Sequence, residues 1–244
     1  MTRPDHFGGE TARRYDDDSA EMFAPDVLGP TVDTLADLAG DGPALEFALG
    51  TGRVALPLAE RLEVHGIEWS ADMLATFEGK PGAERVTAVR GDMASTRVPG
   101  AFSLVYLVFN TIGNLTTQDE QVACFANAAA HLRPGGRFLV EVGVPDLQRL
   151  PFGERFVPFH VGADHVGIDE YDLVEQGLVS HHLSADGDGC WRRASPPFRY
   201  VWPAELDLMA RLAGMTREHR WAGFDRAPFT ATSRSHVSVW RRPA

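Results

Sequence analysis

The chain has 244 residues, a formal net charge of −11 and a hydrophobic fraction of 44%, as expected for a globular protein with a sizeable core. The acidic balance, with no Lys/Arg-dense stretch, argues against nucleic acid or an anionic membrane as the main partner. No apolar run approaches the roughly 20 residues that span a bilayer, and the first residues lack the apolar core of a signal peptide. Cys124 and Cys190 have no companions at metal-ligand spacing, so the sequence predicts a cytoplasmic protein with reduced thiols and no metal.

The N-terminal segment is polar, and we predict an arm over residues 1–20 that ends in a short helix. Tyr15 is the large aromatic residue in the middle of this arm. It would be either a surface tyrosine that anchors the arm or a lid residue over a pocket. A helix is predicted over 31–39, with Pro30 in its first turn and Gly40 as its stop.

Residues 43–142 alternate between apolar runs typical of strands and segments of helical periodicity. The predicted strands lie at 43–48, 64–68, 85–89, 102–109 and 137–142. The predicted helices lie at 52–62, 71–77 and 117–132, and Pro134-Gly135-Gly136 separates the last helix from the last strand. This alternation predicts an α/β fold with a doubly wound, mostly parallel sheet and helices on both faces.

The pattern changes after residue 145. Alternating segments without helices are predicted at 155–159, 165–168, 173–182 and 198–202, with a hairpin turn at Asp186-Gly187-Asp188-Gly189. A helix at 204–213 and strands at 216–221 and 235–240 follow. We therefore divide the chain into an arm and cofactor-binding core (1–144), an inserted antiparallel β cap (145–202) and a final helix and strands that complete the core sheet (203–244).

The turn after the first strand indicates a nucleotide ligand. The run from Gly50 to Ala55 satisfies G-x-G-x-x-A, and Glu68 lies 18 residues beyond Gly50, near the spacing of an acid that binds ribose hydroxyls. Both a dinucleotide and S-adenosylmethionine fit these features. Glu46 distinguishes them, because its carboxylate would repel a pyrophosphate and attract the ammonium and sulfonium groups of S-adenosylmethionine. The first strand also starts some 40 residues into the chain, later than in many dinucleotide domains.

Residues 44–142 resemble the class I S-adenosylmethionine-dependent methyltransferases. Four segments carry the resemblance in the family's order: Leu45 to Arg53, Gly66 to Leu74, Gly91-Asp92-Met93 and Leu132 to Gly136. The family implies a seven-stranded sheet with an antiparallel ending. One departure is Ala48, which stands where the family has its first glycine. We expect its methyl group to be tolerated only if this residue keeps a negative φ.

The resemblance implies a role for each matching residue. Glu46 would orient the amino group of the cofactor, and Glu68 would bind the ribose hydroxyls. Asp92 would accept a hydrogen bond from the adenine amine. The other residues expected to contact the cofactor are Phe47, Ala48, Gly50, Gly52, Trp69, Met73, Met93 and Phe109. The alternatives are that Glu68 and Asp92 are solvated strand ends, that Met73 belongs to the core and that Trp69 is a surface aromatic.

Methyl transfer from a sulfonium is an in-line displacement, for which the protein supplies alignment, desolvation and, for a protonated nucleophile, a base. The acceptor would approach the end of the fourth strand. No proline follows Asn110, unlike the Asn/Asp-Pro-Pro-Tyr/Phe motif of enzymes that methylate nucleic-acid amines, so we expect a small molecule with an N or O nucleophile. Candidate catalytic residues are Asn110, Tyr15 and His182. Expected substrate-lining residues are Tyr15, Asn110, Asn114, His182, Arg199 and Tyr200.

The sequence thus predicts a methyltransferase of the EC 2.1.1 type, monomeric or homodimeric, with S-adenosylmethionine as its cofactor. The inserted layer resembles, in arrangement, that of sugar-amine N-methyltransferases from antibiotic pathways. An NAD(P)-dependent oxidoreductase that uses the same turn is an alternative. A non-catalytic S-adenosylmethionine-binding protein is another, since Ala48 departs from the motif and no general base is obvious. Both His181 and His182 are also compatible with structural, hydrogen-bonded roles.

Overall fold

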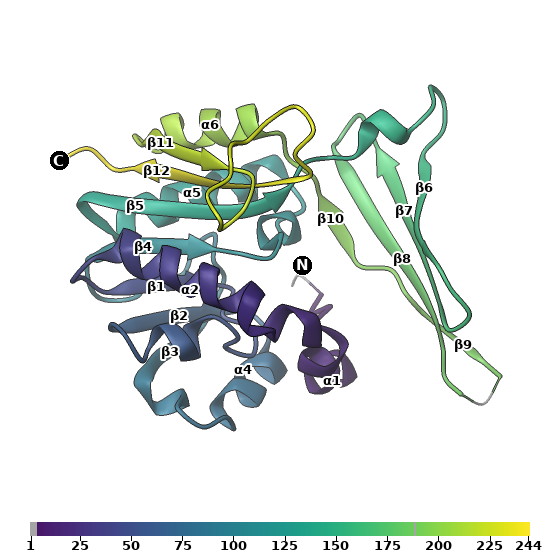
Figure 1. The fold of residues 1–244 in the computed structure, drawn as a ribbon, viewed down its shortest axis with the longest axis horizontal. Coiled ribbons are helices and arrows are strands. Elements are labelled where there is room, and N and C mark those ends of the chain that lie inside the picture. Colours follow the sequence, from purple (N-terminus) through teal and green to yellow (C-terminus); the bar gives the residue numbers. More distant parts are fainter. Residues whose placement is uncertain (1–3, 188) are drawn as a thin grey trace.

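Two sheets organise the molecule (Figure 1). The computed structural model describes residues 4–187 and 189–244; residues 1–3 and Asp188 lie outside the description. The larger sheet carries the helices, and the smaller one stands beside the edge at which the parallel strands of the larger sheet end (Figure 1). The N-terminal helix α1 lies near this edge as well.

The larger sheet is seven-stranded, with the order β3-β2-β1-β4-β5-β12-β11. Only β12 runs against its neighbours; the other neighbouring strands pair in parallel. The strands are β1 Ala44–Phe47, β2 Val64–Glu68, β3 Val86–Arg90, β4 Phe102–Leu107, β5 Leu132–Gly143, β11 Thr216–Trp221 and β12 Ser235–Arg241. The predicted fold class is confirmed, including the antiparallel ending.

Helices cover both faces of this sheet, because the central strands are apolar on both sides. One face packs against α5 Gln118–His131 and α6 Pro203–Leu212 in a core that includes Phe125, Phe138 and Trp240. The other packs against α2 Pro25–Ala39, α3 Ala55–Leu58 and α4 Ala71–Glu78. The remaining helical segments are α1 Glu10–Asp18, η1 Ala20–Phe23, η2 Ala83–Arg85, η3 Thr111–Asn114 and η4 Leu147–Arg149.

Several boundaries differ from the predicted ones. Helix α2 starts at Pro25, so Pro30 lies inside the helix and not in its first turn. Helix α3 is much shorter than predicted. Strand β4 ends at Leu107 because Phe109 and Asn110 both have a φ of 60°. Strand β5 runs through Pro134-Gly135-Gly136, and its pairing with β4 shifts register there.

The turn after β1 requires left-handed backbone. Gly50 and Gly52 have φ values of 59° and 80°, and a Cβ on Gly52 would lie 2.5 Å from the ring of Phe77. The expectation for Ala48 is wrong, because its φ is 54°. The reason is that strand β1 ends at Phe47 just before it, and Leu49 just after it is fixed: its N–H donates to Ile67 O over 3.0 Å and its carbonyl accepts from Gly52 N–H over 3.0 Å. Ala48 therefore carries the strain of a Cβ in the left-handed region.

The smaller sheet is antiparallel, as predicted. It consists of β6 Phe156–Val161, β7 His165–Asp172, β8 Gly177–Ala185, β9 Trp191–Ala194 and β10 Pro197–Arg199, in the order β10-β8-β7-β6 with β9 also paired to β8. The predicted segment 173–182 is wrong in its first half, because the chain turns after Asp172 with Gln176 at a φ of 56°. The predicted hairpin at 186–189 connects β8 to β9, and Asp188 within it is outside the described residues.

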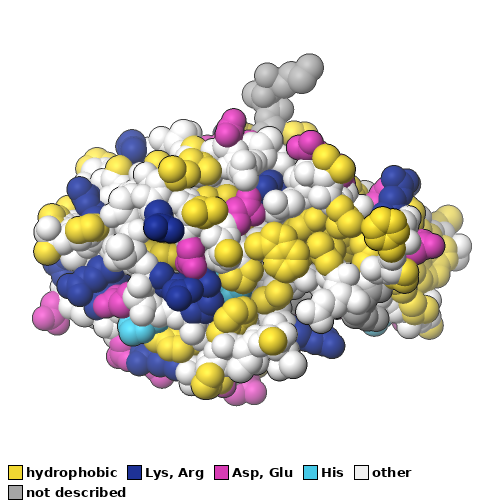
Figure 2. Space-filling view, turned by 90° about the horizontal axis from the view of Figure 1, so that it is seen from above, with side chains coloured by type: hydrophobic (Ala, Val, Ile, Leu, Met, Phe, Trp, Pro, Cys, Tyr) yellow, Lys and Arg dark blue, Asp and Glu magenta, His cyan; other side chains and the backbone are white. Residues whose placement is uncertain are grey.

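The smaller sheet has little core of its own. Its buried cluster comprises Val157, Tyr171 and Tyr200. Large apolar side chains are exposed nearby, among them Phe152, Phe156, Phe159 and Leu173. In Figure 2 the hydrophobic side chains of the face shown gather toward this end of the molecule. The position of the cap must therefore depend on its junction with the larger sheet.

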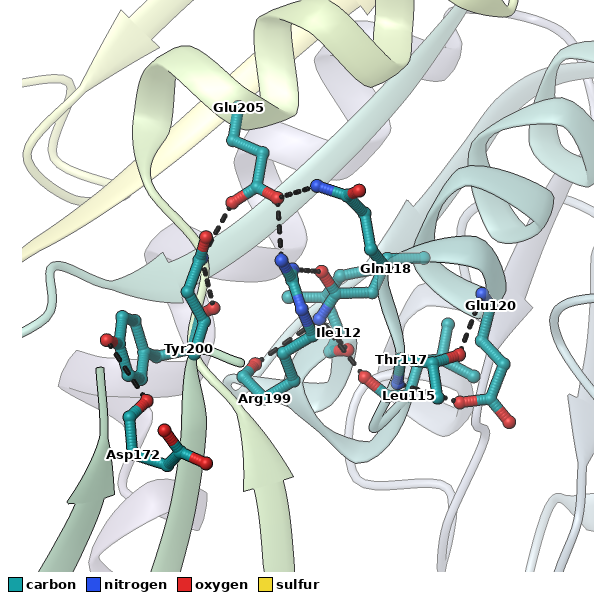
Figure 3. Close-up of polar contacts among 11 residues, drawn as sticks. Ile112, Leu115, Thr117, Gln118, Glu120, Asp172, Arg199, Tyr200 and Glu205 are labelled. Atoms are coloured by element: carbon teal, nitrogen blue, oxygen red, sulfur yellow. Dashed lines mark hydrogen bonds and ion pairs between the residues drawn. The ribbon is translucent and has the colours of Figure 1, made fainter. Parts of the chain in front are cut away.

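A buried polar network forms that junction (Figure 3). Arg199, at the end of β10, is only 5% exposed, and it donates to Gln121 Oε1 over 2.6 Å and to Glu205 Oε1 over 2.8 Å. The Gln121 amide donates in turn to the carbonyls of Ile112, Leu115 and Arg199. The guanidinium expected to line the substrate is thus bonded to α5 and α6. Tyr200 is buried in the core of the cap.

We expect Arg199→Met to lower the free energy of unfolding by about 3 kcal/mol, because it leaves the Glu205 carboxylate without its buried cationic partner. Arg61→Met is the matched control: the Arg61–Asp33 pair has side-chain exposures of 43% and 71%, so its loss should cost less than about 1 kcal/mol. Urea unfolding followed by tryptophan fluorescence measures both variants. A cost for Arg199→Met no larger than that of the control would contradict the structural role.

Ala48→Gly should raise the free energy of unfolding by about 1 kcal/mol, since glycine adopts the left-handed conformation without a Cβ clash. The control is Ala75→Gly at an exposed position inside α4, which should lower it by about 1 kcal/mol. Urea unfolding should therefore give opposite signs for the same chemical change, and destabilisation by both variants would refute the assigned strain.

Candidate functional site

The predicted cofactor residues converge where β1, β2 and β4 end. These strands are adjacent and parallel, so their carboxyl ends share one edge of the sheet. The turn at Gly50 and Gly52 leaves β1 there, Glu68 ends β2, and Phe109 follows β4. An edge at which the strand order reverses on either side of β1 is where open α/β sheets bind ligands.

Glu68 joins the glycine turn to the start of α4. Its Oε2 accepts the Gly50 N–H over 2.7 Å, and its Oε1 accepts the Ser70 N–H over 2.7 Å. Ser70 caps α4 by accepting from Met73 N, as the sequence suggests. Burial raises the pKa of Glu68, and the backbone donors from Ser70 and Gly50 oppose the increase. Each carboxylate oxygen keeps a lone pair for a further donor.

Glu46 is buried at 3% exposure between β1 and β4. Its Oε2 accepts a hydrogen bond from the Tyr106 hydroxyl over 3.0 Å, since the two residues pair in register on neighbouring strands. Burial raises the pKa of Glu46 to about 8, against the lowering effects of Tyr106 and the Arg53 guanidinium. A positive group placed beside this carboxyl would favour its ionised form.

Four further predicted residues lie beyond β2 and β3. Trp69 is 37% exposed, and Met73, on α4, is 2% exposed. Asp92 follows β3, and its Oδ1 accepts the Ala94 N–H over 2.8 Å. Met93 is buried in the core under α5, where its carbonyl accepts from Asn127. Trp69 and Asp92 thus have the surface access that an adenine ring requires, and Met73 and Met93 are closer to the core.

At the end of β4, Phe109 is 38% exposed and lies under the Arg53 guanidinium, 5.2 Å from the ring centroid. Asn110 is exposed, and its Oδ1 accepts the Gly143 N–H over 2.5 Å, which ties β4 to β5. Asn114 is half-buried at the end of η3. The Phe47 side chain is buried in the core and packs near His131 and Phe138. Its contribution to the cofactor edge would therefore be its backbone.

Tyr15 lies over this edge, on α1. The helix is fixed to the cofactor loop by a 2.5 Å hydrogen bond from Thr51 Oγ1 to Asp16 Oδ1. An ion pair between Asp16 and Lys80, just after α4, fixes it to that helix as well. Tyr15 is half-buried, and its ring meets the edge of Phe7 at 6.4 Å between centroids. Burial raises its pKa, and the charges of Arg53 and Glu68 are near enough to contribute. The short helix predicted at the end of the arm is thus present as α1, beside the site.

His182 lies on the cap surface that faces α1. His182 and Ser184 are two positions apart on β8, so their side chains lie on the same surface of the cap. Arg192 pairs directly with Ser184, lies on that surface too, and forms a 2.7 Å ion pair with Glu10 of α1. His182 Nδ1 is 3.1 Å from His165 Nε2, and its Nε2 is 3.2 Å from Ser180 Oγ, so both ring nitrogens are engaged within the cap. Burial lowers its pKa. His181 points to the opposite surface and bonds Glu170 and Ser195.

Two charged residues at the edge were not expected from the sequence. Glu141, in β5, accepts the Phe109 N–H through Oε2 over 2.7 Å, and burial raises its pKa. Arg53 follows the glycine turn and donates to Met22 O over 3.2 Å. Both line a cavity of about 380 Å³ between α2 and the β11–β12 loop. The signal for Glu141 was a charge inside the apolar run of β5.

Among the described residues, no helix is long and apolar enough to cross a membrane. Nor does any group of three or more His, Cys, Asp or Glu side chains in residues 4–187 and 189–244 have an arrangement that could hold a metal ion.

Comparisons with known proteins agree with this geometry. Residues 44–136 match a family model described as a methyltransferase domain. The CcbJ methyltransferase from Streptomyces caelestis is 38% identical, with a TM-score of 0.81 and 91% of each chain covered. The cypemycin N-terminal methyltransferase of a Streptomyces species is 27% identical over 93% of this chain and 97% of its own length.

A dTDP-3-amino-3,6-dideoxy-alpha-D-glucopyranose N,N-dimethyltransferase from Streptomyces fradiae is 36% identical over 50% of this chain and 45% of its own. This match extends over about half of the chain. The relative that is 38% identical is covered over 91% of both chains. Together with the four sequence motifs and the convergence of their residues at one sheet edge, it shows that the chain belongs to the class I S-adenosylmethionine-dependent methyltransferases.

Proposed function

We propose that this enzyme transfers the methyl group of S-adenosylmethionine to an aliphatic amine of a small natural-product molecule. The observation that carries the proposal is the convergence of Glu46, Glu68 and the Gly50–Gly52 turn at one edge, beneath a cap. Relatives named for methylating the N-terminus of cypemycin and the amino group of a dTDP-sugar support an amine as the acceptor.

The cofactor would lie along the carboxyl edge with its adenosine over β2 and its methionine over β1. Glu68 would accept from the ribose hydroxyls while keeping its bonds to Gly50 and Ser70. Glu46 would take the cofactor ammonium. Adenine would rest between Trp69 and Asp92, with Met73 and Met93 beneath, and Phe109 would lie near the transferred methyl.

A neutral amine needs no covalent help to attack the methyl group. Its lone pair forms the N–C bond as the C–S bond breaks, and the positive charge passes from sulfur to nitrogen. The protein would supply alignment and a dry environment, for which the ordered helix α1 and the cap at 145–202 are suitably placed. We propose Tyr15 and Asn110 as residues that contact the acceptor, with Asn114 further along the same loop.

We do not assign His182 the role of base, because both of its ring nitrogens are engaged within the cap. Arg199 and Tyr200 are proposed to set the position of the cap and not to contact the substrate, since their side chains are buried at its junction and in its core. We propose a small-molecule acceptor with no nucleic-acid or membrane partner, and a monomeric or homodimeric cytoplasmic enzyme.

Glu68→Ala should weaken S-adenosylmethionine binding at least about a hundredfold, because it removes two charge-assisted hydrogen bonds to the ribose and frees the glycine turn. Glu63→Ala, which removes an exposed acid just before β2, is the control and should leave the affinity within about twofold. Isothermal titration calorimetry measures both. Unchanged affinity in Glu68→Ala would contradict the proposed cofactor site.

The affinity for S-adenosylmethionine should rise between pH 6 and 7.5, by up to about tenfold per pH unit, since Glu46 has a pKa of about 8 and must lose its proton to receive the ammonium group. The α-amino group stays protonated over most of this window. Glu46→Gln should remove most of the pH dependence and bind more weakly at pH 7.5. Calorimetry at three pH values tests this, and the same slope in both proteins would argue against Glu46 as the ammonium partner.

A further inference from the structure

The cavity beside the cofactor edge is acidic. Its volume is about 380 Å³, which is sufficient for a small ligand. Three carboxylates line it: Asp26 from the first turn of α2, Glu141 from β5 and Asp225 from the β11–β12 loop. Arg53 is the lining cation, and its guanidinium is held over the Phe109 ring and by Met22 O. Three acids against one arginine favour a cationic ligand.

Among these carboxylates, Glu141 bonds the backbone at the reaction edge. Its backbone pairs with Val237 of β12, and its Oε2 accepts the N–H of Phe109, the residue at which the chain leaves β4. Within residues 4–187 and 189–244, no protein donor reaches Oε1. One oxygen is thus fixed by the backbone, and the other is available to a ligand in the cavity.

A buried carboxylate at this position lowers the stability of the fold unless a partner compensates its charge. Glu141 is half-buried in a strand whose neighbouring side chains, Leu139 and Val237, belong to the core. The Phe109 N–H and the charge of Arg53 offset only part of the loss of hydration of this carboxylate, because burial still raises its pKa. Burial favours its protonated form, whereas an ammonium group in the cavity would restore the charge.

We propose that the cavity between α2 and the β11–β12 loop binds the amino group of the acceptor, and that Glu141 Oε1 is its carboxylate partner. This deepens the proposed function and rests on it, because the acceptor must meet the cofactor methyl at the end of β4. Glu141 would hold the ammonium form on arrival and would accept the proton that the nitrogen must lose before it attacks. This proton would then leave Oε1 for bulk water, so that the carboxylate is charged again when the methyl group is transferred.

The same carboxylate would favour the transfer itself. As the nitrogen lone pair bonds to the methyl carbon and the C–S electron pair returns to sulfur, positive charge appears on the nitrogen beside Glu141. A neutral thioether and a methylated ammonium remain. For a second methylation, the ammonium must lose another proton, and the cavity offers the same oxygen to take it.

Sinefungin provides a test that needs no knowledge of the acceptor. In this cofactor analogue, a carbon-bound amine stands where S-adenosylmethionine carries its sulfonium methyl, whereas S-adenosylhomocysteine has no group there. The wild-type protein should bind sinefungin at least about tenfold more tightly than S-adenosylhomocysteine, because the extra ammonium meets Glu141. Calorimetry on the full chain at pH 7.5 gives both dissociation constants.

Glu141→Gln keeps an oxygen for the Phe109 N–H and removes the charge, so it should abolish most of this preference while S-adenosylhomocysteine still binds. Glu141→Asp should restore part of it. The control Glu175→Gln removes a charge from an exposed turn of the cap and should leave the preference unchanged. An unchanged ratio in Glu141→Gln, or an equal loss of both ligands, overturns the proposal.

The wild-type protein alone also decides the matter if Glu141→Gln does not fold, since equal affinity for the two analogues would refute an ammonium site at the methyl position. Failure of the proposed function gives a different result. If the cofactor does not lie at this edge, Glu68→Ala binds S-adenosylhomocysteine as well as the wild-type protein does. If only the acceptor site is wrong, Glu68→Ala binds S-adenosylhomocysteine more weakly, and the wild-type protein binds sinefungin and S-adenosylhomocysteine with nearly equal affinity.

Discussion

The Glu68 carboxylate is the contact on which the cofactor edge depends. It accepts one backbone N–H from the turn after β1 and another from the start of α4, and so fixes a turn that lies 18 positions before it in the chain. The turn must be held in this way because Ala48, Gly50 and Gly52 all have left-handed backbone, which an unsupported chain would leave. The carboxylate that would bind the ribose is therefore also the one that shapes the loop around it.

Burial of negative charge is the second constraint. Burial raises the pKa of Glu46, Glu68 and Glu141, three acids at the same edge. Without a ligand this arrangement disfavours their ionised forms. The ammonium and sulfonium groups of the methyl donor, together with the amine of the acceptor, would supply counter-charges for these acids. The electrostatics of the site therefore suit a cationic methyl donor and a basic acceptor, and do not suit a pyrophosphate.

The cap is positioned from outside itself. Its own buried cluster is small, and its attachment comes from the Arg199 network with α5 and α6 and from the ion pair between Arg192 and Glu10 of α1. Arg199, which the sequence suggested as a substrate-lining residue, therefore attaches the cap to α5 and α6. The consequence for function is that the width of the site depends on the orientation of α1 and β10 as much as on the residues that face the ligand.

The sequence alone determined the architecture and the chemistry of the cofactor edge, because both depend on local patterns: strand and helix periodicity over 43–142, the glycine turn, and acids at the ends of successive strands. It could not determine the conformation of Ala48, which neighbouring backbone hydrogen bonds impose, or the burial of Arg199. Glu141 was also hidden in sequence, since its importance arises only when β5 lies beside β4 and the β11–β12 loop closes over it. Tertiary structure decides Glu141 and Arg199 because Phe109 lies 32 positions from Glu141 and Gln121 lies 78 positions from Arg199, and periodicity does not report contacts at that distance.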